Sequence, residues 1–162
     1  MLKPKETKNI EPENKSQPAP TYYHAVGRRK EATARVRLYV VPGKSLVLGD
    51  KTYTKGQIIV NDRSIETYFP GVVTKVKYLE SFRTTNTLER FVTTVVVVGG
   101  GLAGQLEAVV HGVARALEQV DREKYRPILK KRGFLTRDPR AKQRRKAGFA
   151  GKARKKKQSP KR

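Results

Sequence analysis

The feature that constrains this chain most is a run of four valines, followed by three glycines and an apolar-striped segment. Val95 to Val98 are β-branched residues that favour a buried strand, and Gly99 to Gly101 allow the backbone to turn sharply. The apolar residues that come next recur with a helical period, at Leu106, Val109, Val110, Val113, Leu117 and Val120. The sequence therefore predicts a strand, a glycine turn and a helix, in that order.

The N-terminus of such a helix carries unpaired backbone N–H groups that attract an anion. Gly99, Gly101 and Gly104 match the G-x-G-x-x-G pattern of dinucleotide-binding folds. A cofactor site needs a second parallel strand after the helix, ending in an acid that holds the ribose. Asp121 lies 20 residues after Gly101, but no strand pattern follows it, so we expect no cofactor. A nucleic-acid phosphate is the favoured anion, and close packing of strand and helix is the alternative that stays open.

Charge separates the chain into two parts. It has 37 Lys and Arg against 14 Asp and Glu, a net charge of +23 in 162 residues. Residues 130–162 hold 16 of the basic side chains and one acid, Asp138. A tail of this kind suits a polyanion, and nucleic acid is the leading candidate. A protein that compacts DNA without sequence preference would carry the same tail, and composition does not separate the two.

A second basic feature lies near the start of the folded region. Residues 22–26 read as a short strand, followed by Arg28, Arg29 and Lys30 in a turn. The next run alternates, with residues 34, 36, 38 and 40 apolar and with Arg35, Arg37 and residue 39 on the other face. In a chain of this charge we interpret these cations as phosphate contacts, the alternative being that they solvate an exposed sheet face.

Catalytic and metal sites are not predicted. The chain has no cysteine and two histidines, and no paired acids at ligand spacing surround either histidine. His111 shares a helix face with Glu107 and Arg115, four residues before and after it, so this stripe is either a solvated polar face or a phosphate contact. No apolar stretch is long enough to span a bilayer, and no secretory signal is visible. A cytosolic protein is the simplest interpretation.

The other elements follow from shorter patterns. Residues 46–48 and 52–54 predict a small hairpin, residues 57–60 a strand, and residues 64–69 one helical turn. Val73, Val76, Leu79 and Phe82 are spaced by three, which predicts a helix despite the β-branched residues. Asp121 is expected to cap a second, shorter helix that ends near residue 131. We therefore divide the chain into a disordered extension (1–21), a globular RNA-binding body (22–135) and an extended basic tail (136–162).

Three motifs, in the same order, resemble the S-nine family of small-subunit ribosomal proteins, bacterial type. The first is the segment Ala25-Val26-Gly27-Arg28-Arg29-Lys30-Glu31-Ala32-Thr33-Ala34-Arg35-Val36. The second is the glycine turn with the helix that follows it, through residue 117, and the third is residues 133–138 with the basic run to residue 162. The resemblance covers residues 22–162.

The resemblance implies a fold and a set of partners. The fold is α+β, a mostly antiparallel sheet with helices packed on it, of the ribosomal S-five domain-two kind, with a long extended basic C-terminal tail. The partners are ribosomal RNA in the head of the small subunit, peptidyl-site tRNA and neighbouring head proteins, on a cytoplasmic or organellar ribosome. No enzyme activity, cofactor or metal is implied.

The predicted ribosomal RNA contacts come from the first hairpin, the glycine turn, the helix stripe and the tail. They are Arg28, Arg29, Lys30, Arg35, Arg37, Gly100, Gly101, Gln105, His111, Arg115, Arg137, Arg140, Arg144, Arg145, Lys146 and Arg154. The family's last two residues lie near the anticodon stem-loop of the tRNA, and they match Lys161 and Arg162 here. The family commonly ends in Phe-Ser-Lys-Arg, whereas this chain ends in Ser-Pro-Lys-Arg.

Overall fold

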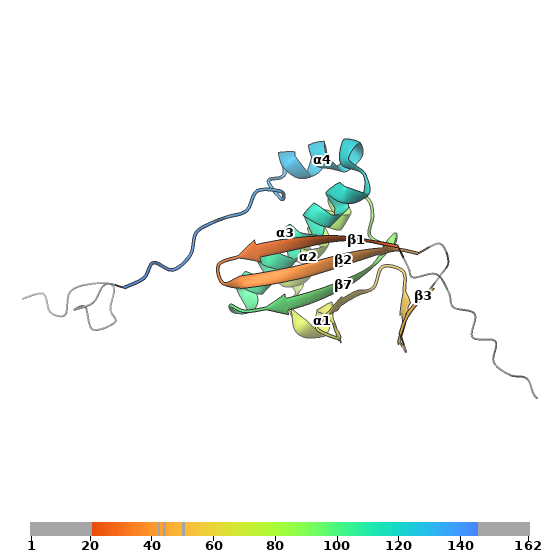
Figure 1. Ribbon diagram of the computed structural model, residues 1–162, viewed down its shortest axis with the longest axis horizontal. Helices are drawn as coiled ribbons and strands as arrows, with labels where there is room; N and C mark the ends of the chain where they lie inside the picture. The colour runs from red at the N-terminus through yellow and green to blue at the C-terminus, as the bar shows by residue number, and fades with distance from the viewer. Residues whose placement is uncertain (1–20, 42, 44, 50, 146–162) are drawn as a thin grey trace, which may run out of the picture.

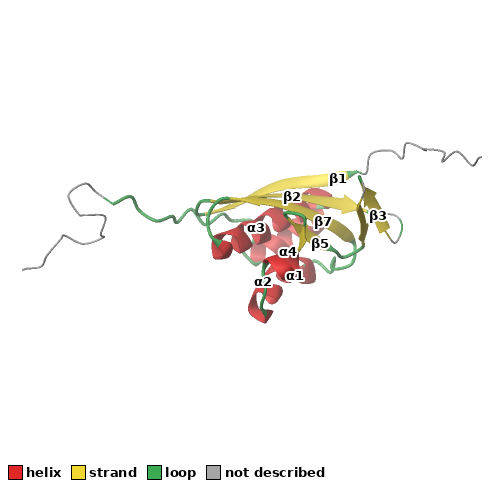
Figure 2. Ribbon diagram, turned by 90° about the horizontal axis from the view of Figure 1, so that it is seen from below, coloured by secondary structure: helices red, strands yellow, loops and turns green. Residues whose placement is uncertain are grey.

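The structure is a computed structural model that describes residues 21–41, 43, 45–49 and 51–145. The expected N-terminal extension and the C-terminal part of the tail, including Lys146, Arg154, Lys161 and Arg162, therefore lie outside the described residues. The described chain forms a five-stranded sheet with helices packed on one of its faces (Figures 1 and 2). This arrangement confirms the predicted α+β class.

The strands of the sheet are ordered β1-β2-β7-β5-β6. Strands β1 (Tyr22–Arg29), β2 (Ala32–Val40) and β7 (Phe91–Val98) pair antiparallel, which agrees with the expected mostly antiparallel sheet. Strand β5 (Ile58–Val60) pairs parallel with β7 and antiparallel with the two-residue β6 (Arg63–Ser64). The sheet is thus mixed, because the chain crosses over from β5 to β7 through two helices.

The helices that cover the sheet are α1 (Ile65–Tyr68), α2 (Val72–Thr84), α3 (Leu102–Val120) and α4 (Arg122–Lys131). Helix α3 lies along β1 and β2 and buries the apolar stripe that begins at Leu106 (Figure 1). Helix α4 begins at Asp121, whose carboxylate accepts a hydrogen bond from the Lys124 backbone at 3.0 Å, so the predicted cap is confirmed. In the described residues no strand follows α3, which removes the second strand that a dinucleotide site requires.

The outer face of the sheet is covered at one end by the hairpin of β3 (Ser45–Leu48) and β4 (Lys51–Thr54). Leu46, Leu48 and Tyr53 of the hairpin pack over a small cluster of buried residues on the sheet that includes Tyr39 and Val92. This cover corrects the predicted pattern of β2, because Tyr39 is buried while Val40 is 39% exposed. Alternation along a strand does not show that the hairpin following it will fold back over one of its faces.

One local prediction was wrong. Arg28 and Arg29 belong to β1, and the turn is formed by the next two residues, because the strand continues until Arg29 pairs with Ala32. The helix predicted from Val73, Val76, Leu79 and Phe82 is confirmed as α2, and its buried side chains are Tyr78, Ser81 and Phe82. Val72 and Val73 are 81% and 70% exposed, so α2 turns a different side to the core than its apolar spacing indicates.

Candidate nucleic-acid interface

The glycine turn is shaped by the hairpin between β1 and β2. Gly99 and Gly100 have φ values of 76° and 63°, a conformation that L side chains rarely adopt. A Cβ on Gly99 would lie 2.5 Å from the Glu31 carbonyl oxygen, and one on Gly100 would lie 3.0 Å from the Ala32 Cβ. Both glycines are therefore needed for the turn and for its close approach to β2.

The N-terminus of α3 is left open by this turn. Gly101 occupies the N-cap position with an extended φ of −113°, and no side chain caps the first N–H groups of the helix. A hollow of about 430 Å³ lies in front of them, lined by residues 100–104, Glu31 and two lysines, Lys30 and Lys142. Free N–H groups beside two ammonium groups favour an anion at this place.

The side chain of Gln105, which was expected to contact RNA, is bonded within the protein. Its amide nitrogen donates to the Gly99 carbonyl oxygen at 3.0 Å, and its amide oxygen accepts from the Tyr68 hydroxyl at 3.0 Å. The side chain thus ties the glycine turn to α1, which makes it a positioning residue for the turn.

The polar stripe of α3 faces the free edge of β1. The Arg28 backbone N–H donates to His111 Nδ1 at 3.3 Å, and Arg115 Nη1 donates to the Val26 carbonyl oxygen at 2.6 Å. Strand β1 is the edge of the sheet, and these two bonds satisfy backbone groups that point away from β2. The predicted solvated stripe is wrong for His111, which is half-buried against the strand.

Burial lowers the pKa of His111, and the charges of Arg115 and Arg137 lower it further, while a hydrogen bond with the Leu135 backbone raises it. The Nδ1 atom accepts a hydrogen bond and therefore carries no proton. Burial and the neighbouring cations thus disfavour the charged form of His111.

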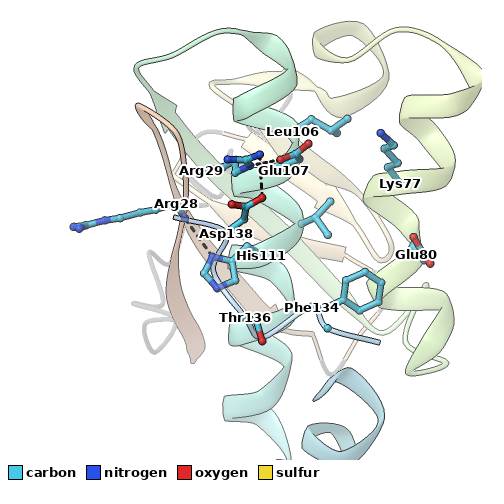
Figure 3. Close-up of a pocket in the computed structure, with 12 residues that line it drawn as sticks. Arg28, Arg29, Lys77, Glu80, Leu106, Glu107, His111, Phe134, Thr136 and Asp138 are labelled. Atoms are coloured by element: carbon cyan, nitrogen blue, oxygen red, sulfur yellow. Dashed lines mark hydrogen bonds and ion pairs between the residues drawn. The ribbon is translucent and has the colours of Figure 1, made fainter. Parts of the chain in front are cut away.

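Arg29 anchors the start of the C-terminal segment to the body (Figure 3). Its Nε donates to Glu107 at 2.5 Å, its Nη2 lies 3.1 Å from Asp138, and its Nη1 donates to the Arg140 carbonyl oxygen at 2.6 Å. The side chain is 12% exposed. Hydrogen bonds from Arg140, together with the charges of Arg140 and Arg29, hold the pKa of Asp138 well below its usual range.

These contacts place Arg29 beside a cavity of about 310 Å³ formed between α2, α3 and residues 133–138. Figure 3 shows Arg29, Glu107 and Asp138 gathered at one side of it, with the Arg28 side chain pointing away. Glu107 and Asp138 are the functional residues that the sequence prediction missed as partners of Arg29. The four-residue spacing of Glu107 and His111 was a signal for a shared face, although nothing in the sequence indicated what that face contacts.

The other predicted cations of the described chain are exposed. Residues 136–145 form no helix or strand, and their side chains are exposed except for that of Asp138. The exposed predicted cations are Arg28, Lys30, Arg35, Arg37, Arg115, Arg137, Arg140, Arg144 and Arg145. The Arg29 contacts and the hollow shared by Lys30 and Lys142 bring residues 138–142 next to the β1–β2 hairpin. The structure thus joins two cationic segments that lie about a hundred residues apart.

A family model described as Ribosomal protein S9/S16 matches residues 27–162, which is most of the chain. The chain belongs to this family. The S-nine family consists of structural, non-enzymatic constituents of the ribosome. The described residues hold no group of three or more His, Cys, Asp or Glu side chains that could bind a metal ion. Among those same residues no helix has the length and apolar character needed to cross a membrane.

Proposed function

We propose that this protein binds small-subunit ribosomal RNA in the subunit head and extends its C-terminal tail towards peptidyl-site tRNA. The observation that carries the proposal is that residues 137–145, with their exposed cations, lie next to the β1–β2 hairpin, which carries exposed cations of its own. RNA offers a phosphate for each such cation, whereas a small ligand would engage two or three of them.

The site residues divide into two roles under this proposal. Arg28, Lys30, Arg35 and Arg37 of the hairpin contact RNA together with Arg137, Arg144 and Arg145, and one phosphate lies at the open N-terminus of α3. Arg140 is bonded to Asp138 through Nε and Nη2, and it keeps only its remaining donors for RNA. Arg29, Gln105, His111 and Arg115 hold the turn, the edge strand and the C-terminal segment in place, because their polar atoms already bond within the protein.

Binding to ribosomal RNA should depend steeply on salt, because each neutralised phosphate releases counterions. With roughly 6–10 phosphate contacts, the affinity of the full chain for small-subunit ribosomal RNA should fall by about 10³–10⁵ between about 50 and 200 mM salt. Filter binding across this range measures it. Salt-insensitive binding, or a chain that fails to sediment with the small subunit, would contradict the proposal and favour a free-standing compactor.

The tail proposal concerns Lys161 and Arg162, which match the family's last two residues. Deletion of both should leave assembly of the small subunit nearly intact and weaken tRNA binding in the peptidyl site. Sedimentation of subunits carrying the truncated chain, followed by a tRNA-binding assay, separates the two effects. Failure of assembly would show that the division into an anchoring body and a tRNA-facing tip is wrong.

Neighbouring head proteins are the second proposed class of partner. Val72 and Val73 at the start of α2, together with Val76, form an exposed apolar surface that is unusual in so charged a chain. A Val73→Asp chain should bind ribosomal RNA as the unchanged chain does and enter the small subunit less efficiently. Equal incorporation of both chains would remove this surface from the proposal.

A further inference from the structure

In the described part of the chain, nothing covers the outer face of the three antiparallel strands beyond the β3–β4 hairpin. We call it the open sheet face and define it by Tyr22, His24, Arg28, Arg35, Arg37 and Val96, which are all exposed. The helices lie on the other side of the sheet (Figure 2). No described helix therefore lies between this face and a binding partner.

The register of the strands makes the face an ordered grid. Arg35 and Arg37 lie on the central strand of the three, so each is flanked by a residue of β1 and a residue of β7. In the first row Arg35 lies between Val26 of β1 and Val96 of β7. In the second row Arg37 lies between His24 of β1 and Thr94 of β7. Arg35 and Arg37 are two residues apart on one strand, so their Cα atoms are about 6.8 Å apart and their side chains leave the same face.

The charge of the face is of one sign. Alternate residues of β1, β2 and β7 point to it, and these positions include Arg28, Arg35 and Arg37 but no carboxylate. Arg29, by contrast, lies on the other side of β1 and is bonded to Glu107 and Asp138. An open face with three guanidinium groups and no acid is complementary to a polyanion.

An aromatic side chain lies beside these charges. The Tyr22 ring is 46% exposed, and the Arg37 guanidinium carbon lies 5.4 Å from its centroid. The ring also packs at a tilt against Tyr39, with centroids 5.4 Å apart, and Tyr39 is buried beneath the hairpin. Tyr22 is therefore a supported aromatic platform next to a cation, which is the combination that stacks an unpaired base.

We propose that the open sheet face binds an unpaired stretch of RNA, with one base stacked on Tyr22 and phosphates held by Arg35 and Arg37. The inference rests on the proposed binding of ribosomal RNA and names the kind of RNA that this face takes. A duplex keeps its base faces stacked inside and would leave Tyr22 and Val96, which is 54% exposed, without a partner. An unpaired strand offers both base faces and phosphates to this surface.

The test titrates the full chain with a short labelled single-stranded RNA of mixed sequence and with a duplex of the same length. Tyr22→Ala should weaken single-strand binding by roughly tenfold and leave duplex binding unchanged, because stacking is lost and no charge is removed. Tyr22→Phe keeps an aromatic ring and should bind as the unchanged chain does.

A charge-matched pair of double variants tests the arginines. Arg35→Gln with Arg37→Gln should lower the slope of log affinity against log salt for the single strand by about 1.4, since each phosphate contact contributes about 0.7. The control, Arg122→Gln with Lys131→Gln, removes the same charge from exposed positions of α4, on the helical side of the sheet. It should change the slope clearly less.

The outcomes are distinguishable. An unchanged chain that fails to bind small-subunit ribosomal RNA overturns the proposed function itself. A chain that binds this RNA, but whose Tyr22→Ala and double-arginine variants bind the single strand as the α4 control does, overturns the inference alone. Variants that keep full RNA binding but no longer enter the small subunit would assign the face to a protein, which also overturns it.

Discussion

The two faces of the central sheet are built from alternate residues of the same strands, yet they differ in burial and in charge. The inner face is closed by α3, which approaches so near that a Cβ on Gly27 would lie 1.9 Å from the Ala108 carbonyl oxygen. The outer face is covered at one end by a hairpin and otherwise presents arginines. The inner face therefore packs against a helix, and the outer face is exposed to a binding partner.

The largest test of this contrast is Gly27→Ala. The new Cβ would meet backbone atoms of Ala108 and Gly112, which do not move cheaply, so the free energy of unfolding should fall by about 3 kcal/mol or more. Chemical denaturation of both chains measures it. In the control Gly101→Ala the Cβ meets nothing within 4 Å, and the loss should stay below about 1 kcal/mol. Equal losses of unfolding free energy in the two variants would show that the close approach of α3 is not the reason why position 27 requires glycine.

Adjacent valines of β7 compare the two faces directly. Val97 points inward and is 5% exposed, whereas Val96 points outward and is 54% exposed. Val97→Ala should cost about 2 kcal/mol through lost burial and a cavity, and Val96→Ala should cost less than about 1 kcal/mol. Urea unfolding of the two variants gives both values. A reversed order would mean that the outer face is covered.

A smaller effect concerns His111, at the β1 edge of the inner face. Its pKa is lowered in the folded protein relative to the ordinary 6.5, so the unfolded chain binds more protons as the pH falls. Stability should therefore decrease as the pH falls through 6.5 and level off below the folded pKa. In His111→Asn the amide oxygen can accept the Arg28 N–H without titrating, and the decrease between pH 7.5 and 5.5 should become shallower. Urea unfolding at both pH values measures it, and identical slopes would contradict the assignment.

The smallest effect on stability is expected at the outer face. Arg35→Gln with Arg37→Gln should change the free energy of unfolding by less than about 0.5 kcal/mol, since both side chains are exposed. Thermal unfolding of the free chain is the measurement. A large loss of stability would mean that the two arginines support the fold. The changes in RNA affinity described above would then reflect a weakened fold and not a lost RNA contact.

Much of the fold could be predicted from local patterns. The valine run, the three glycines and the apolar period from Leu106 specify β7, the turn and α3, because each pattern matches one backbone geometry. Helix α2 was predicted as a helix, but its apolar spacing does not show its buried face, since three of its valines lie outward while Tyr78 and Ser81 are buried. Which side of a helix is buried depends on what packs against it, and α2 meets α3 and α4.

The candidate site was predictable as a set of cations but not in its division of roles. The run Arg28, Arg29, Lys30 looks uniform in sequence, yet strand alternation sends Arg29 to Glu107 and Asp138 and leaves Arg28 exposed. His111 and Arg115 likewise follow a helical period, but the edge of β1 that they contact lies more than eighty residues away.

The sequence by itself determined the strand–turn–helix unit, the charge and the family, because these are properties of short segments and their order. Tertiary structure decided which cations are free, since that depends on where acids, edge strands and the β3–β4 hairpin come to lie. The glycines illustrate the difference. Their sequence predicts a turn, whereas only the packed fold shows that Gly99 must leave room for Glu31 and that Gly101 leaves the helix end open.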